Sequence, residues 1–210
     1  MEKIRQTLSA LRVHWPRILI ACLVLALSFG AGMSMQAALE RTEKEEEIQA
    51  ALSNFSRQMK IFSNDVKRIT REAEQAEAAG KPAEDPSENH VISSDLAFLR
   101  AKAVAIADMA ELPGSRQYPN AKVYLASWEP ALLGAGCADA EALTEIETIC
   151  RPLWDAVTGL SCKDTMARLE ENVTSGDYQD ALDLLGIGDL IPTTTQGGTL
   201  HWNRRNSASW

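Results

Sequence analysis

Glu129 is the residue whose neighbours offer the clearest route to chemistry. It lies between Trp128 and Pro130, and apolar neighbours raise the pKa of a carboxyl group, which allows a glutamate to act as a general acid. Such an acid would suit hydrolysis of the glycan strands of peptidoglycan. No second acidic residue shares its segment and no catalytic motif surrounds it. We therefore expect a surface carboxylate and keep a cell-wall hydrolase using Glu129 as the enzymatic alternative.

The common catalytic and metal-binding motifs are missing from the sequence. It contains no Gly-x-Ser-x-Gly, no phosphate-binding loop and no His-Glu-x-x-His. The histidines His14, His90 and His201 lie far apart and next to no cysteine, whereas zinc ligands recur at short, fixed spacings. We therefore expect no catalytic site, no cofactor and no metal.

The cysteines leave two interpretations open. Cys137, Cys150 and Cys162 follow one another at intervals of 13 and 12 residues, and Cys22 lies in an apolar N-terminal stretch. In an oxidising compartment three thiols predict one disulfide and one free thiol. Cys150 shares a helix face with Ile146, so a buried free thiol is an equally good interpretation.

The apolar stretch near the N-terminus determines where the rest of the chain lies. Residues 18–39 are 22 consecutive uncharged, mostly apolar side chains, and about 20 suffice to cross a bilayer as a helix. Basic residues precede the stretch, which predicts a membrane anchor with a cytoplasmic N-terminus. The anchor residues that we expect in the bilayer or at its surface are Trp15, Arg17, Ile18, Leu19, Leu23, Leu25, Leu27 and Phe29.

A cleavable signal peptide is the alternative for this stretch. Residues 18–29 would form its apolar core and residues 30–32 supply small side chains near its end. Apolar and small residues continue to Leu39, well beyond such a core, which favours the anchor. The arm that remains, residues 1–17, is too short to fold as a domain, and this excludes a signalling receptor.

The charge of the chain changes sign across the anchor. Residues 1–17 hold four basic and one acidic side chain, whereas residues 18–210 hold 17 basic and 28 acidic side chains. Proteins that bind nucleic acid present a basic surface to the phosphates. We therefore expect no direct binding of DNA or RNA.

A heptad repeat follows the anchor. Apolar residues recur at alternating steps of four and three from residue 48 to residue 76, and no Pro or Gly occurs from residue 33 to residue 79. The pattern predicts that the helix continues as a coiled-coil stalk over residues 40–79. The flanking positions are largely uncharged, so both a self-associating coil and an internal hairpin remain open. The expected interface residues are Ile48, Leu52, Phe55, Met59, Phe62, Val66 and Ile69.

A loop over residues 80–93 and a small helical domain over residues 94–192 are predicted next. The first helix of this domain would be capped by Ser94 or Asp95 and, at about 18 residues, would cover half of the coil. The membrane-proximal half would stay free for another chain. Further helices are expected at 120–128, 139–150, 163–173 and 177–185. The expected core residues are Val123, Leu125, Trp128, Leu132, Leu143, Ile146, Ile149, Leu153, Trp154 and Val157.

The C-terminal part contains a short resemblance and a polar tail. Residues 176–182, Gly-Asp-Tyr-Gln-Asp-Ala-Leu, resemble the turn and second-helix start of a tetratricopeptide repeat. No period of 34 residues recurs, so these residues predict an ordinary helical hairpin. The tail, residues 193–210, is expected to be disordered alone, and its isolated Trp and Arg residues suit folding onto a partner.

Together these features predict an all-α, single-pass protein of a bacterial inner membrane whose bulk is periplasmic. We expect a non-enzymatic structural or assembly subunit of an envelope complex of the secretion, conjugation, pilus or division type, an inference from architecture alone. Its expected partners are the lipid bilayer, other membrane or periplasmic subunits and a second copy through the coil. A phage-type inner-membrane spanin is the alternative, although spanins normally lack so large a helical end.

Overall fold

The described part of the chain is built mainly from helices. The computed structural model describes residues 2–82, 86–157, 159 and 161–194, and for residues 2–19 and 21 it describes the backbone alone. All the regular elements within these ranges are helices, which confirms the predicted all-α fold. The chain divides into two compact units, residues 1–44 and residues 45–210.

Helix α1, Glu2–Ala78, contributes to both units. Near its N-terminus it contains a stretch that is long and apolar enough to cross a membrane, and none of this stretch is buried. Leu23, Leu25, Leu27 and Phe29 are each more than half exposed. Uncovered apolar side chains in such a run are typical of a helix that lies in a bilayer. The side chains of four other predicted anchor residues lie outside the description, namely Trp15, Arg17, Ile18 and Leu19.

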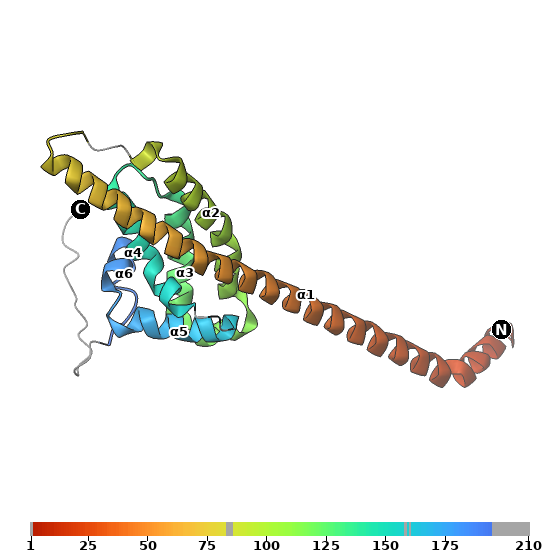
Figure 1. Ribbon diagram of the computed structural model, residues 1–210. Helices are drawn as coiled ribbons and strands as arrows, with labels where there is room; N and C mark the ends of the chain where they lie inside the picture. Colours follow the sequence, from red (N-terminus) through yellow and green to blue (C-terminus); the bar gives the residue numbers. More distant parts are fainter. Residues whose placement is uncertain (1, 83–85, 158, 160, 195–210) are drawn as a thin grey trace, which may run out of the picture. The chain divides into compact units, whose positions relative to one another are not determined.

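The second unit is a cluster of helices crossed by the C-terminal part of α1 (Figure 1). Helix α3 contacts α2 and α5, and α4 contacts α5 and α6. The short 3₁₀ helices η1, η2 and η3 precede and follow α2. The bounds of these elements are η1 Pro86–Glu88, α2 His90–Ala107, η2 Asp108–Glu111, η3 Pro113–Gln117, α3 Pro119–Gly134, α4 Ala140–Ala156, α5 Cys162–Ser175 and α6 Gln179–Leu184.

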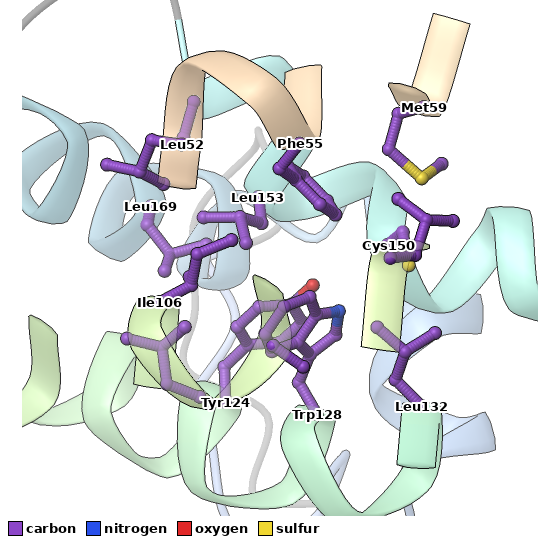
Figure 2. Close-up of a cluster of buried hydrophobic side chains, with 14 of the residues drawn as sticks. Leu52, Phe55, Met59, Ile106, Tyr124, Trp128, Leu132, Cys150, Leu153 and Leu169 are labelled. Carbon is purple, nitrogen blue, oxygen red and sulfur yellow. The ribbon is translucent and has the colours of Figure 1, made fainter. Parts of the chain in front are cut away.

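The apolar stripe of α1 is buried inside this second unit. All seven predicted interface residues, from Ile48 to Ile69, are at most 6% exposed. Figure 2 shows Leu52 and Phe55 facing side chains of α2, α3, α4 and α5. The expectation that the membrane-proximal half of the stripe stays free for another chain is therefore wrong. That expectation considered α2 alone as a cover, whereas the shorter helices together present enough apolar surface to cover the rest.

Aromatic side chains occupy the centre of the core. Phe55 of α1 and Trp128 of α3 meet edge to face, with ring centroids 5.7 Å apart and an interplanar angle of 85°. The fully buried Tyr124 satisfies its hydroxyl group by donating to the carbonyl oxygen of Ile149 at 2.6 Å. All ten residues that the sequence predicts for the core belong to this cluster or pack against it.

Helix α2 begins earlier than the sequence predicts. Its N-cap is Asn89, whose side-chain oxygen accepts hydrogen bonds from the backbone N–H groups of Val91 and Ile92. Asparagine caps a helix as well as the predicted Ser94 or Asp95 does, and burial of Ile92 against the core favours the earlier start.

Two prolines lie inside helices that the sequence predicts to end before them. Pro130 lies within α3 and Pro152 within α4. A proline in a helix loses one backbone hydrogen bond and crowds the preceding turn. Leu132 and Leu153, which follow the prolines, are at most 1% exposed, and burial of these side chains offsets that loss.

Charged side chains of neighbouring helices cap both ends of α3. At the N-terminus, the Glu170 carboxylate of α5 accepts from the backbone N–H of Ala121 and from the side-chain amide of Asn120, both at 2.7 Å. At the C-terminus, the Arg100 guanidinium of α2 donates to the carbonyl oxygens of Leu132 and Ala135. An anion at the start and a cation at the end also complement the helix dipole. These contacts fix the helix that carries Tyr124 and Trp128.

Candidate functional site

An open groove between α4 and α6 is the candidate site. One part has a volume of about 490 Å³ and the adjoining part about 270 Å³. Thr144, Thr148 and Asp180 line both parts, so we treat them as one feature, the α4–α6 groove. Its other lining residues are Glu141, Glu145, Glu147, Arg151, Asp177, Tyr178, Ala181, Asp183 and Leu184.

The groove is strongly acidic. Its lining contains three glutamates of α4 and three aspartates of α6 and the turn before it. Its basic lining residue, Arg151, donates to the Glu147 carboxylate at 2.7 Å and lies 4.6 Å from the centre of the Trp154 ring. Because Arg151 offsets one of six carboxylates, the groove keeps a negative charge that attracts cationic side chains.

Glu147, a lining residue of the groove, is hydrogen-bonded to α1. Glu147 is 9% exposed and accepts a hydrogen bond from the hydroxyl group of Ser63, itself buried on α1, at 2.8 Å. The same carboxylate oxygen accepts from Arg151. Two donors satisfy this partly desolvated charge, so the bottom of the groove is held in a fixed position against the core.

Tyr178 lines the smaller part of the groove and carries a hydroxyl group that stays protonated. It donates to the Asp155 carboxylate at 3.0 Å. Burial, followed by the hydrogen bond to Asp155, raises the pKa of Tyr178 to about 12. The residue therefore offers a neutral hydroxyl group and an aromatic face to anything in the groove.

The groove contains neither Glu129 nor, among its described residues, a cluster that could hold a metal ion. Among the described residues, no three His, Cys, Asp or Glu side chains are placed to hold a metal ion. Glu129 does not line the groove; it lies on α3, partly buried, next to the fully buried Trp128. The carboxylates of α4 and α6 and the threonine hydroxyl groups of the lining can accept hydrogen bonds from cationic groups, beside the apolar surface of Leu184.

The thiols do not form a disulfide. Cys137, Cys150 and Cys162 are all free, so the structure departs from the predicted disulfide and agrees with the buried-thiol interpretation. Burial raises the pKa of Cys150 to about 12, and the Cys162 sulfur lies 3.6 Å from the Glu45 carbonyl oxygen of α1. Burial also raises the pKa of Cys162, so the thiolate form is disfavoured at both Cys150 and Cys162.

The acidic residues of the groove recur at short, regular intervals in the sequence. Asp177, Asp180 and Asp183 recur every three residues, and Glu141 and Glu145 are four apart. Residues three or four apart are neighbours on a helix surface, which brings Glu141 close to Glu145 on α4 and Asp180 close to Asp183 on α6, while Asp177 lies in the turn before α6. Both helices of the predicted hairpin are present as α5 and α6, and each of them packs on α4. The tryptophans and arginines predicted to bind from the tail lie outside the described residues.

Comparison of the chain with protein-family models, with curated proteins and with solved structures finds no match. The function is therefore inferred from the chain's own geometry.

Proposed function

We propose that this chain is a non-enzymatic, single-pass protein of a bacterial inner membrane and a structural or assembly subunit of an envelope complex. One observation carries the proposal: the apolar stretch of α1 is uncovered, although the helical unit buries its own core. A bilayer is the medium that such a stretch requires. The four basic residues of the arm favour a cytoplasmic N-terminus and a periplasmic helical unit.

The partner contact of this subunit is the α4–α6 groove, and its occupant is a basic segment of another subunit. The charge of the groove supports this assignment, because its six carboxylates face one guanidinium that is already paired. Leu184, 43% exposed at the groove, adds apolar contact area. We do not propose that a second copy of the chain binds to the apolar stripe of α1, because the side chains of this stripe are buried within the chain itself.

The test is affinity purification of the full-length chain from solubilised membranes, followed by identification of the co-eluting proteins. The test variant is Glu145→Lys with Asp180→Lys, two exposed residues that line the groove. The matched control is Glu74→Lys with Glu77→Lys, two exposed acidic residues of α1. We expect a companion that the control retains and the test variant loses. Recovery of the chain alone, or equal loss from both variants, would contradict the proposal.

A further inference from the structure

The residues that follow α6 fold back along that helix. Ile187 and Ile191 are at most 5% exposed and belong to the core, which fixes this part of the chain in place. Gly188 lies so close to α6 that a Cβ atom added to it would contact the side chains of Gln179 and Asp183. Asp183 lines the α4–α6 groove, so the returning chain runs beside the groove.

Thr194 is fixed next to the turn that precedes α6. Its backbone N–H and its hydroxyl group donate to the carbonyl oxygen of Thr174, at 2.8 Å and 3.0 Å. Asp177 and Tyr178, three and four residues after Thr174, line the smaller part of the groove. Three residues of chain span at most about 11 Å. The C-terminal segment, residues 195–210, lies outside the described residues, but its starting point is therefore close to the groove.

The C-terminal segment is long enough to cover the groove. On α4 the lining residues run from Glu141 to Arg151, which is about 15 Å at 1.5 Å per residue. Arg204 follows Thr194 by ten residues, and ten residues span about 33 Å when extended and about 18 Å as a flexible chain. Both values exceed the length of the groove along α4, so the segment has the reach to contact its carboxylates.

The charge of the C-terminal segment is opposite to that of the groove. Residues 195–210 contain Arg204 and Arg205 and no acidic side chain. The lining of the groove holds six carboxylates, and its Arg151 is already paired with one of them. Guanidinium groups form strong, charge-assisted hydrogen bonds with carboxylates, and Trp202 adds an aromatic side chain of the type that anchors interfaces. Charge and reach thus point to the same occupant.

We propose that the C-terminal segment occupies the α4–α6 groove of its own chain, with Arg204 and Arg205 on the carboxylates, and that a partner must displace it. The second half of this inference rests on the proposed function, because it takes the same groove as the partner contact. A short flexible connection gives the segment an effective concentration of about 1 mM at the groove. A basic segment of another subunit therefore binds only when its affinity overcomes this competition.

The first test is photo-cross-linking within the purified full-length chain in detergent. A photoreactive side chain in place of Asn203 should form an adduct with α4 or α6 of the same chain, which mass spectrometry of the digested protein identifies. Arg204→Glu with Arg205→Glu should abolish the adduct. Lys60→Glu with Lys67→Glu, two exposed positions of α1, should retain it. An adduct with other elements, an adduct between two chains, or one that survives the reversal of both arginines would overturn the proposal.

The second test measures the competition with a fluorescent peptide that has the sequence of residues 195–210. Fluorescence anisotropy should show tighter binding of this peptide to the Arg204→Glu, Arg205→Glu chain than to the wild type, whose groove already holds its own segment. For a peptide with a Kd of about 0.1 mM, an effective concentration of about 1 mM predicts a roughly tenfold difference. Asp180→Lys with Asp183→Lys should abolish binding. Equal affinities for the wild type and the arginine variant, or no binding to either, would contradict the proposal.

The two tests fail separately from the proposed function, because they use the purified chain without a partner. An internal adduct from a chain that recovers no companion from membranes would contradict the proposed function alone. A companion that is lost when the charge of the groove is reversed, from a chain that gives no internal adduct, would contradict this inference alone.

Discussion

Replacement of Phe55 by alanine is expected to destabilise the helical unit strongly. Phe55 is fully buried and meets Trp128 edge to face at 5.7 Å. Truncation of a buried phenylalanine costs about 3–5 kcal/mol, which includes the aromatic pair. At about 2–4 °C per kcal/mol for a chain of this size, the midpoint of thermal unfolding should fall by roughly 6–20 °C. Circular dichroism of the full-length chain in detergent measures this midpoint.

Ile61→Ala is the matched control, because Ile61 lies on the same helix and is 43% exposed. An exposed substitution of this kind should change stability by at most about 0.5 kcal/mol. If α1 instead formed a coil with a second chain, the unfolding midpoint of the wild type would rise with protein concentration, and Phe55→Ala would abolish that rise. Such concentration dependence, or equal effects of the two substitutions, would refute burial of Phe55 within its own chain.

Three further predictions concern single side chains. Glu170→Ala removes the N-terminal cap of α3 and should lower the unfolding free energy by about 1–2 kcal/mol, whereas Glu171→Ala, at an exposed position, should leave it unchanged in the same urea titration. Burial raises the pKa of Asp95, so Asp95→Asn should raise the unfolding free energy at a pH above that pKa, and the gain should shrink as the pH falls through it; a gain that is constant with pH would contradict the raised pKa. Cys150 should react with iodoacetamide far more slowly than Cys137 in the native chain and equally fast after denaturation, as mass spectrometry can follow; fast native labelling of Cys150 would refute its burial.

The sequence predicted the buried face of α1 but not its cover. Alternating steps of four and three from Ile48 to Ile69 show which side of a helix must avoid water. They do not show whether α2, a second chain or the other helices supply the cover, because that depends on contacts between residues far apart in the chain. The helices that cover α1 are short, and the apolar surface of each one alone is too small to indicate that it packs against α1.

The helix ends and the groove could also be predicted only in part, because they too depend on contacts between residues far apart in the chain. Pro130 and Pro152 indicated helix ends by local rules, yet Leu132 and Leu153, buried against other helices, extend both helices beyond the prolines. The acidic spacing of α6 is visible in the sequence, but its position opposite α4 arises from tertiary packing. Polar contacts between helices, such as that of Asp95 with Gln58, 37 residues apart, leave no periodic signal at all.

Photo-cross-linking in living cells tests the central claim most directly. A photoreactive side chain in place of Thr148, within the α4–α6 groove, should give an adduct with a second polypeptide in the membrane fraction. The adduct should disappear in the presence of Asp180→Lys with Asp183→Lys and persist with Glu74→Lys and Glu77→Lys. Recovery of the chain from the soluble fraction, or an adduct that is indifferent to the charge of the groove, would contradict a membrane-anchored subunit that binds a basic partner there.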